Sequence, residues 1–171
     1  MTLRDAVLAT WRTNNRVTVY LVENLPAEVW SAQVPGMPRR TVRMIAGHLH
    51  NARCMWIKTL GGPLGIAIPT SVDRRRVTRA QLIRAFRQSN RSMIRLLGLG
   101  LDHNGSIPLA SAAWVNFPLD VVHVLSYFVA HEGHHRGQII MIARQLGQRL
   151  PAAVTAGVWQ FTKRAKEARE G

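Results

Sequence analysis

Residues 118–146, PLDVVHVLSYFVAHEGHHRGQIIMIARQL, decide the fold class of this chain. The stretch is mostly apolar and far longer than a β-strand, and Gly147 and Pro151 follow it as helix terminators. It is therefore predicted to form one long helix. His131 and His135 are four residues apart within it, so both imidazoles lie on one helical face, about 5–6 Å apart at Cβ. Two imidazoles placed in this way can bind one metal ion.

The rest of the chain also shows helical periodicity and almost no strand-like alternation. Thr78 and Gln81 form a capping-box pattern at the start of one helix, and residues 34–38 and 61–77 are predicted loops. Helices are predicted over residues 3–23, 41–60, 78–97, 118–146 and 152–168, with a short turn of helix at 27–30. The predicted fold is all-α: one domain spanning residues 1–171, with a four-helix bundle over about 3–150 and an additional basic C-terminal helix over about 152–168.

The charge is strongly positive, since Lys and Arg number 23 against 9 acidic residues and give a formal net charge of +14. Such a field attracts polyanions. The most ordered part is a row of four arginines on one helical face, at steps of three, four and four residues: Arg84, Arg87, Arg91 and Arg95. The row indicates either a site for nucleic acid or an acidic partner, or a solvated face. The second interpretation is favoured because no aromatic residues alternate with the arginines.

The cellular compartment is predicted from two absences. The single cysteine, Cys54, permits no internal disulfide and suits a reducing compartment, although a small buried hydrophobic residue is its simpler interpretation. No run of eighteen apolar residues and no secretory signal pattern is present. We expect a cytoplasmic protein without a membrane partner.

The helical face on which each other histidine lies indicates which one could join His131 and His135 as a third imidazole. In the helix predicted over 41–60, His48 shares a face with Ile45 and Met55 and is expected to face the core. His50, beside Arg53, is expected to face solvent. Three neutral imidazoles with an open coordination position are typical of a catalytic metal site, and they suit zinc, nickel, iron or copper.

Other polar residues of the long helix are candidates for proton transfer and orientation. Tyr127 and Gln138 lie on the face of the histidine pair, whereas His134 lies to one side of it. Glu132 and His134 have a second interpretation, as polar residues facing solvent or an interface. Trp56 and Trp114 are candidates for the pocket wall, or else belong to the core.

The segment from His131 to His135 also matches H-E-x-x-H, the motif in which two histidines bind zinc and the glutamate activates water in a metalloprotease. The extended form of that motif needs glycine and histidine where this chain has Gln138 and Met141. No strand pattern precedes the helix, and the only downstream glutamates lie near the end of the chain. The protease interpretation is therefore disfavoured.

Three segments together resemble the DinB/YfiT-like family: Ile45-Ala46-Gly47-His48-Leu49, the stretch from Ala130 to Ile139, and Ala143-Arg144-Gln145-Leu146-Gly147. The resemblance extends to about Pro151. It implies a four-helix bundle, frequent homodimers, and a divalent metal, most often zinc or nickel, bound by three histidines, here His48, His131 and His135. Members of the family include thiol-dependent S-transferases and isomerases of thiol adducts. The family often has an acidic residue shortly after its first histidine, where this chain has Asn51-Ala52-Arg53-Cys54.

The sequence therefore predicts a metal-dependent enzyme that activates a thiol or water for attack on a small-molecule substrate, as an S-transferase or hydrolase. A low-molecular-weight thiol is the expected cosubstrate. Two alternatives stay open: a metal-stabilised basic protein that binds nucleic acid or an acidic partner without catalysis, and a bundle whose site is vestigial.

Overall fold

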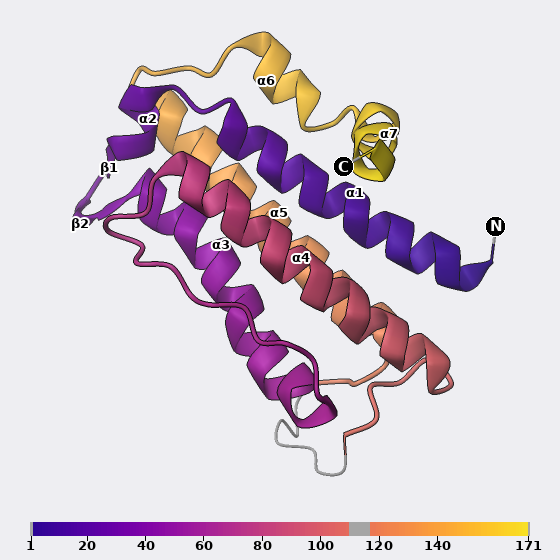
Figure 1. Ribbon diagram of the computed structural model, residues 1–171. Coiled ribbons are helices and arrows are strands. Elements are labelled where there is room, and N and C mark those ends of the chain that lie inside the picture. Colours follow the sequence, from indigo (N-terminus) through magenta and orange to yellow (C-terminus); the bar gives the residue numbers. More distant parts are fainter. Residues whose placement is uncertain (1, 110–116, 171) are drawn as a thin grey trace.

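Four long helices run side by side in the computed structural model, which describes residues 2–109 and 117–170 (Figure 1). The four are α1 (Leu3–Glu23), α3 (Val42–Trp56), α4 (Arg79–Asp102) and α5 (Val121–Gln145). The smaller elements are α2 (Ala27–Ser31), β1 (Gln33–Val34), β2 (Met37–Thr41), a π-helical turn (Ile57–Gly61), a 3₁₀ turn (Gly62–Leu64), α6 (Ala152–Gly157) and α7 (Phe161–Glu170). The prediction of an all-α bundle is confirmed.

Side-chain caps fix where the long helices begin. Thr78 and Gln81 form the predicted capping box at the start of α4, and Thr2 forms another with Asp5 at the start of α1. Asp120 accepts a hydrogen bond from the backbone N–H of His123 and begins α5. His131 and His135 therefore lie in the middle of a helix that has a side-chain cap at its start.

Two apolar clusters fill the bundle, one toward each end. One contains Leu25, Val29, Ile45 and Phe86, and the other contains Trp11, Trp56, Met93 and Phe128, all buried. Each long helix carries buried polar side chains near the point where its contributions to the two clusters meet: Asn14 and Thr18 on α1, His50 and Arg53 on α3, Ser89 and Ser92 on α4, and Glu132 and His135 on α5. A polar layer thus crosses the middle of the core.

The structure corrects the predicted loop at residues 34–38. β1 and β2 form a two-stranded antiparallel hairpin, with Val34 paired to Met37. Gly36 has a φ of +72° in the turn, a conformation that costs glycine no steric clash. The hairpin matters for the site because β2 leads directly into α3 (Figure 1).

The predicted C-terminal helix over 152–168 is also wrong as a single element, because it divides into α6 and α7 around Val158–Gln160. α7 packs against α1. Arg164, one of the basic residues of this segment, is buried, and its guanidinium carbon lies 3.8 Å from the ring centroid of Tyr20. Arg16 of α1 forms ion pairs with Glu23 and Glu167 at 2.7 and 2.8 Å. Aromatic and ionic contacts therefore attach this end of the chain to the bundle.

Within the described ranges, no helix is both long enough and apolar enough to cross a lipid bilayer.

Candidate metal centre

Three imidazoles from two helices meet at one side of the polar layer. α3 contributes His48, and α5 contributes His131 and His135. Each offers a ring nitrogen, and these three nitrogens all lie within 4.8 Å of one another. The Nε2 atoms of His48 and His131 are 3.3 Å apart, and the ring centroids of His48 and His135 are 4.8 Å apart. The structure therefore brings together the three histidines that the sequence singled out.

This donor set fits a divalent metal ion. In a tetrahedral site with Zn–N bonds of about 2.0–2.1 Å, two ligand nitrogens lie about 3.3 Å apart, close to the separation of the His48 and His131 nitrogens. Three imidazoles supply three ligands and leave a further position for water or a substrate atom. His48 and His131 are partly buried and His135 is buried, so the group is shielded from solvent without being closed off.

The three imidazoles are held in the neutral form that a metal requires. Burial, followed by the neighbouring histidines, lowers the pKa of His48 to about 4. Burial also lowers the pKa of His131 and of His135 below the ordinary value. Arg74 and Arg40 add to the effect on His48, since their positive charges oppose protonation. The nitrogen lone pairs therefore stay free at neutral pH.

Gln138 orients His135. The side-chain Oε1 of Gln138 accepts a hydrogen bond from Nδ1 of His135 at 2.8 Å, and its Nε2 donates to Nε2 of His134 at 2.9 Å. A proton on Nδ1 of His135 leaves the Nε2 lone pair for a metal ion. His134 itself is exposed and outside the group of three. It contacts the group through Gln138 and through the ring of His135, with centroids 5.0 Å apart.

Tyr127 packs against the opposite end of the group. Its ring stacks on that of His131 with centroids 5.9 Å apart, and its hydroxyl accepts a hydrogen bond from Nε1 of Trp56 at 3.2 Å. Trp56 is buried and also stacks on Phe117. Of the two predicted pocket tryptophans, Trp56 thus contacts the group through Tyr127, and Trp114 lies outside the described residues.

Glu132 lies on another face of α5 and is completely buried. Its Oε1 accepts a hydrogen bond from Nε of Arg53 at 2.7 Å, and its Oε2 accepts from Asn14 at 2.9 Å and from Thr18 at 2.6 Å. Burial acts to raise the pKa of Glu132, but the Arg53 guanidinium and these hydrogen bonds hold it below its ordinary value. Both carboxylate oxygens are thus directed toward α1 and α3.

The prediction that His50 and Arg53 face solvent is wrong. His50 is buried, with Nδ1 3.2 Å from Oγ of Ser89 and Nε2 2.9 Å from the carbonyl oxygen of Thr70. Arg53 is 0 % exposed. Its guanidinium carbon lies 4.8 Å from the ring centroid of Trp11 and 4.7 Å from that of Phe86. The error arises because α3 contacts both α4 and α5, so it is buried on two faces.

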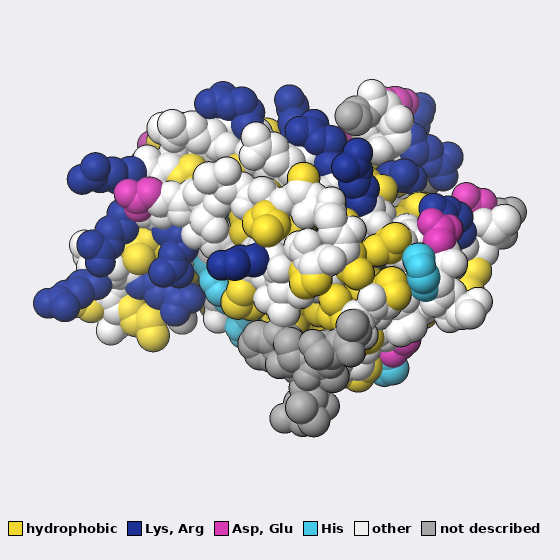
Figure 2. Space-filling model, turned by 60° about the horizontal axis from the view of Figure 1, so that its bottom comes forward, with side chains coloured by type: hydrophobic (Ala, Val, Ile, Leu, Met, Phe, Trp, Pro, Cys, Tyr) yellow, Lys and Arg dark blue, Asp and Glu magenta, His cyan; other side chains and the backbone are white. Residues whose placement is uncertain are grey.

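A cavity of about 490 Å³ adjoins the group, with His48 in its wall. The other lining residues are Met37, Pro38, Arg39 and Arg40 of β2, Met44 of α3, and Arg74. Figure 2 shows Lys and Arg side chains gathered at the end of the molecule that carries the hairpin, next to histidine. Sequence reasoning missed these arginines, because Arg39, Arg40 and Arg74 belong to segments predicted as loop or helix margin. Their common place at the site depends on the tertiary fold.

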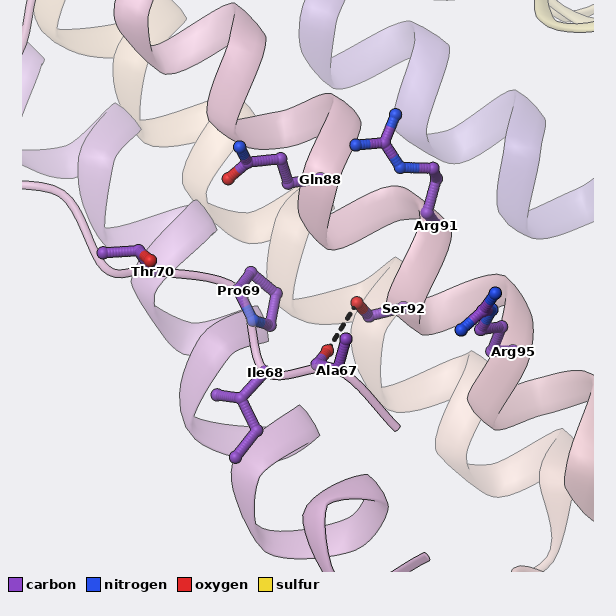
Figure 3. Close-up of a pocket in the computed structure, with 8 residues that line it drawn as sticks. All are labelled: Ala67, Ile68, Pro69, Thr70, Gln88, Arg91, Ser92 and Arg95. Carbon is purple, nitrogen blue, oxygen red and sulfur yellow. Dashed lines mark hydrogen bonds between the residues drawn. The ribbon is translucent and has the colours of Figure 1, made fainter. Parts of the chain in front are cut away.

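The predicted arginine row lies on α4, and all four side chains are exposed. Arg91 and Arg95 line a separate cavity of about 410 Å³ between α4 and residues 67–70. Figure 3 shows this cavity, with Oγ of Ser92 donating a hydrogen bond to the carbonyl oxygen of Ala67 at 2.8 Å. The row is therefore on a different surface from the histidine group.

Comparison with models of known protein families gives a match over nearly the whole length of the chain. The family model of the DinB family matches residues 1–164. The chain belongs to the DinB family. The matched range includes all three histidines, the stretch from Ala130 to Ile139, and part of α7, which the resemblance in sequence had left outside. No curated protein and no solved structure matches the chain.

Proposed function

We propose that this DinB family member is a metal-dependent enzyme whose divalent ion, zinc or nickel, is held by His48, His131 and His135. The observation that carries the proposal is the convergence of three ring nitrogens within 4.8 Å from two helices. A bound ion would supply Lewis acidity and would lower the pKa of a coordinated thiol or water. The reaction class is transfer of a thiol or water to a small-molecule electrophile, with a low-molecular-weight thiol as cosubstrate.

The protein's own residues have distinct parts in this proposal. Gln138 fixes the ring of His135 and connects it to the exposed His134, which is placed to exchange a proton with solvent. Tyr127 holds the ring of His131 by stacking. Glu132 has no part in proton transfer in this proposal, because Arg53, Asn14 and Thr18 donate hydrogen bonds to both of its carboxylate oxygens. The same contacts count against an H-E-x-x-H protease mechanism, in which the glutamate must reach a water on the metal.

Metal content tests the proposal. Purified protein is expected to bind about one divalent ion per chain by elemental analysis, and His48→Ala and His131→Ala are each expected to lose it. His103→Ala is the matched control, because His103 is exposed, lies outside the group of three, and has its Nδ1 within hydrogen-bond distance of the carbonyl oxygen of Leu99. If the metal content of His48→Ala were unchanged, His48 would not be a ligand. Assays with a thiol and an electrophile, with and without the metal, then test the reaction class.

A second function, binding of nucleic acid or another polyanion, is supported by the exposure of all four side chains in the row of Arg84, Arg87, Arg91 and Arg95. Binding to duplex DNA would have to weaken steeply with added salt, because each neutralised phosphate releases a counterion. Substitution of the four arginines by Gln would have to flatten that dependence.

The homodimer and the cytoplasmic location stay predictions. The molar mass in solution tests the first, and cell fractionation tests the second.

A further inference from the structure

The cavity beside His48 has a positive wall built from two separate segments. Arg39 and Arg40 come from β2, and Arg74 comes from the connection between the 3₁₀ turn and α4. No acidic side chain is among the seven residues that line it. In the part of the chain that the structure describes, none of the three guanidinium groups forms an ion pair or donates a hydrogen bond. Their charge and donors are therefore available to a ligand.

Arg74 is held in place by its neighbours in the connection. Asn51 of α3 forms two hydrogen bonds with the backbone of Val72, at 3.0 and 2.9 Å. Nη1 of Arg43 donates to the carbonyl oxygen of Arg75 at 2.9 Å. The connection is thus fixed to α3 on both sides of Arg74, which lowers the entropy lost when a ligand binds.

Gly47 allows the close approach of this connection to α3. A Cβ atom at position 47 would lie 3.2 Å from Cγ and 3.4 Å from Cα of Arg74, tighter than ordinary contact. Gly47 directly precedes His48 in α3, so its missing side chain lets Arg74 pack beside the first histidine of the group. The guanidinium groups and the imidazoles therefore belong to one continuous surface.

The remaining wall of the cavity is apolar, formed by Met37, Pro38 and Met44. We propose that the cavity binds a small organic anion, with its carboxylate or phosphate on Arg40 and Arg74, its apolar body against Met37 and Met44, and its reacting end toward His48. The guanidinium fork matches either oxyanion. This proposal names the substrate class of the proposed function and rests on it. Three neutral imidazoles would leave the double charge of the ion uncompensated, which favours an anion further.

Calorimetric titration with four ring compounds of matched shape tests the charge requirement: benzoate, phenyl phosphate, benzyl alcohol and benzylamine. Each is titrated into metal-free and zinc-loaded protein. Benzoate or phenyl phosphate is expected to bind, with the tighter of the two identifying the oxyanion, and the neutral and cationic compounds are expected to bind at least tenfold more weakly. Equal binding of benzyl alcohol, or no binding of either anion, would overturn the proposal.

Two double variants with the same change in net charge test the location. Arg40→Gln/Arg74→Gln is expected to weaken anion binding by about tenfold or more, the effect of removing hydrogen bonds to charged groups. Arg91→Gln/Arg95→Gln changes the separate cavity shown in Figure 3. Its anion-binding affinity is expected to stay within twofold of that of the wild type. An equal loss in both variants would show a general effect of net charge and would overturn the proposal.

Metal analysis of the same samples separates this proposal from the one on which it rests. If zinc binds at one per chain and anions do not, the metal site stands and the substrate class is wrong. If the wild type binds no metal, yet its metal-free form binds benzoate or phenyl phosphate through Arg40 and Arg74, the proposed function fails and the anion cavity stands.

Discussion

Two faces of α5 differ although their residues alternate in one short segment. His131 and His135 lie at a partly open surface, with ring nitrogens directed at one another and at His48. Glu132 and Arg136 lie toward α1, where Nη1 of Arg136 donates to Asn14 and Thr18 at 2.9 and 2.7 Å. The first face carries neutral imidazoles that have few hydrogen-bond partners. The second face carries side chains of opposite charge that form several hydrogen bonds to neighbouring helices. Adjacent residues of one motif thus belong to different groups: the histidines to a cluster that could hold a metal ion, and Glu132 and Arg136 to the contacts that join the helices.

Removal of the buried carboxylate should have the largest effect. Glu132→Ala leaves Arg53 without its acidic partner inside the core, and loss of one member of a buried ion pair costs about 3–5 kcal/mol. We expect this loss in the free energy of unfolding measured by urea denaturation. Asp102→Ala is the control, because the ion pair of Asp102 with Arg4 is exposed on both sides and should contribute about 1 kcal/mol or less. Similar losses in both variants would contradict the assembly role.

Metal addition should affect the other face. At a free zinc concentration of about 100 times the dissociation constant, the wild type should gain about 2.7 kcal/mol of stability. His48→Ala and His135→Ala should gain almost none while keeping the helical circular dichroism of the metal-free wild type. If His48→Ala gained as much as the wild type, α3 would contribute no ligand.

Gln138→Ala should weaken metal binding without abolishing it. The variant loses the acceptor that keeps a proton on Nδ1 of His135, and loss of such a partner costs about tenfold in affinity or somewhat more. His134→Ala should have a smaller effect, since His134 contacts the other end of the Gln138 amide. Competition with a chromogenic chelator measures the metal affinity of both variants. A larger loss of affinity in His134→Ala than in Gln138→Ala would indicate that His134 is itself a ligand.

Acidification should destabilise the metal-free protein through the same imidazoles. Because the pKa of His48 is about 4 in the folded state and 6.5 for an unperturbed histidine side chain, the unfolded chain binds more protons between these values. The contribution to stability is thus complete above pH 6.5 and is lost as the pH falls toward 4. We expect about 1 kcal/mol, because the ring is partly exposed and solvent reduces the full effect. His48→Ala should show a flatter dependence in thermal unfolding between these pH values.

The sequence predicted the histidine group better than the polar layer. The i, i+4 spacing of His131 and His135 determines their common face, and the phase of α3 directed His48 toward them. The same phase argument failed for His50 and Arg53, because it assumes one buried face per helix and α3 is covered by α4 as well as α5. Asn14 and Thr18 are four residues apart and share a helical face with Val7, Trp11 and Leu21, which was a local signal of a buried polar partner.

The hairpin and the break between α6 and α7 could not be predicted from periodicity. A two-residue strand such as β1 is too short to show alternation, and its pairing with β2 depends on the turn at Gly36. The division of the C-terminal segment brings Arg164 against Tyr20, a contact between residues 144 positions apart in the chain. Long-range contacts of this kind determine where helices end as much as local preference does.

The wall of the cavity and the histidine group come from different kinds of structure. The three imidazoles project from long helices, whereas Arg39, Arg40 and Arg74 belong to a strand of the hairpin and to a connection. Surface connections accept substitutions and insertions more readily than packed helices do. Descendants of this chain could therefore exchange the hairpin or the connection, and so change the charge and shape of the cavity, while inheriting the same three histidines unchanged.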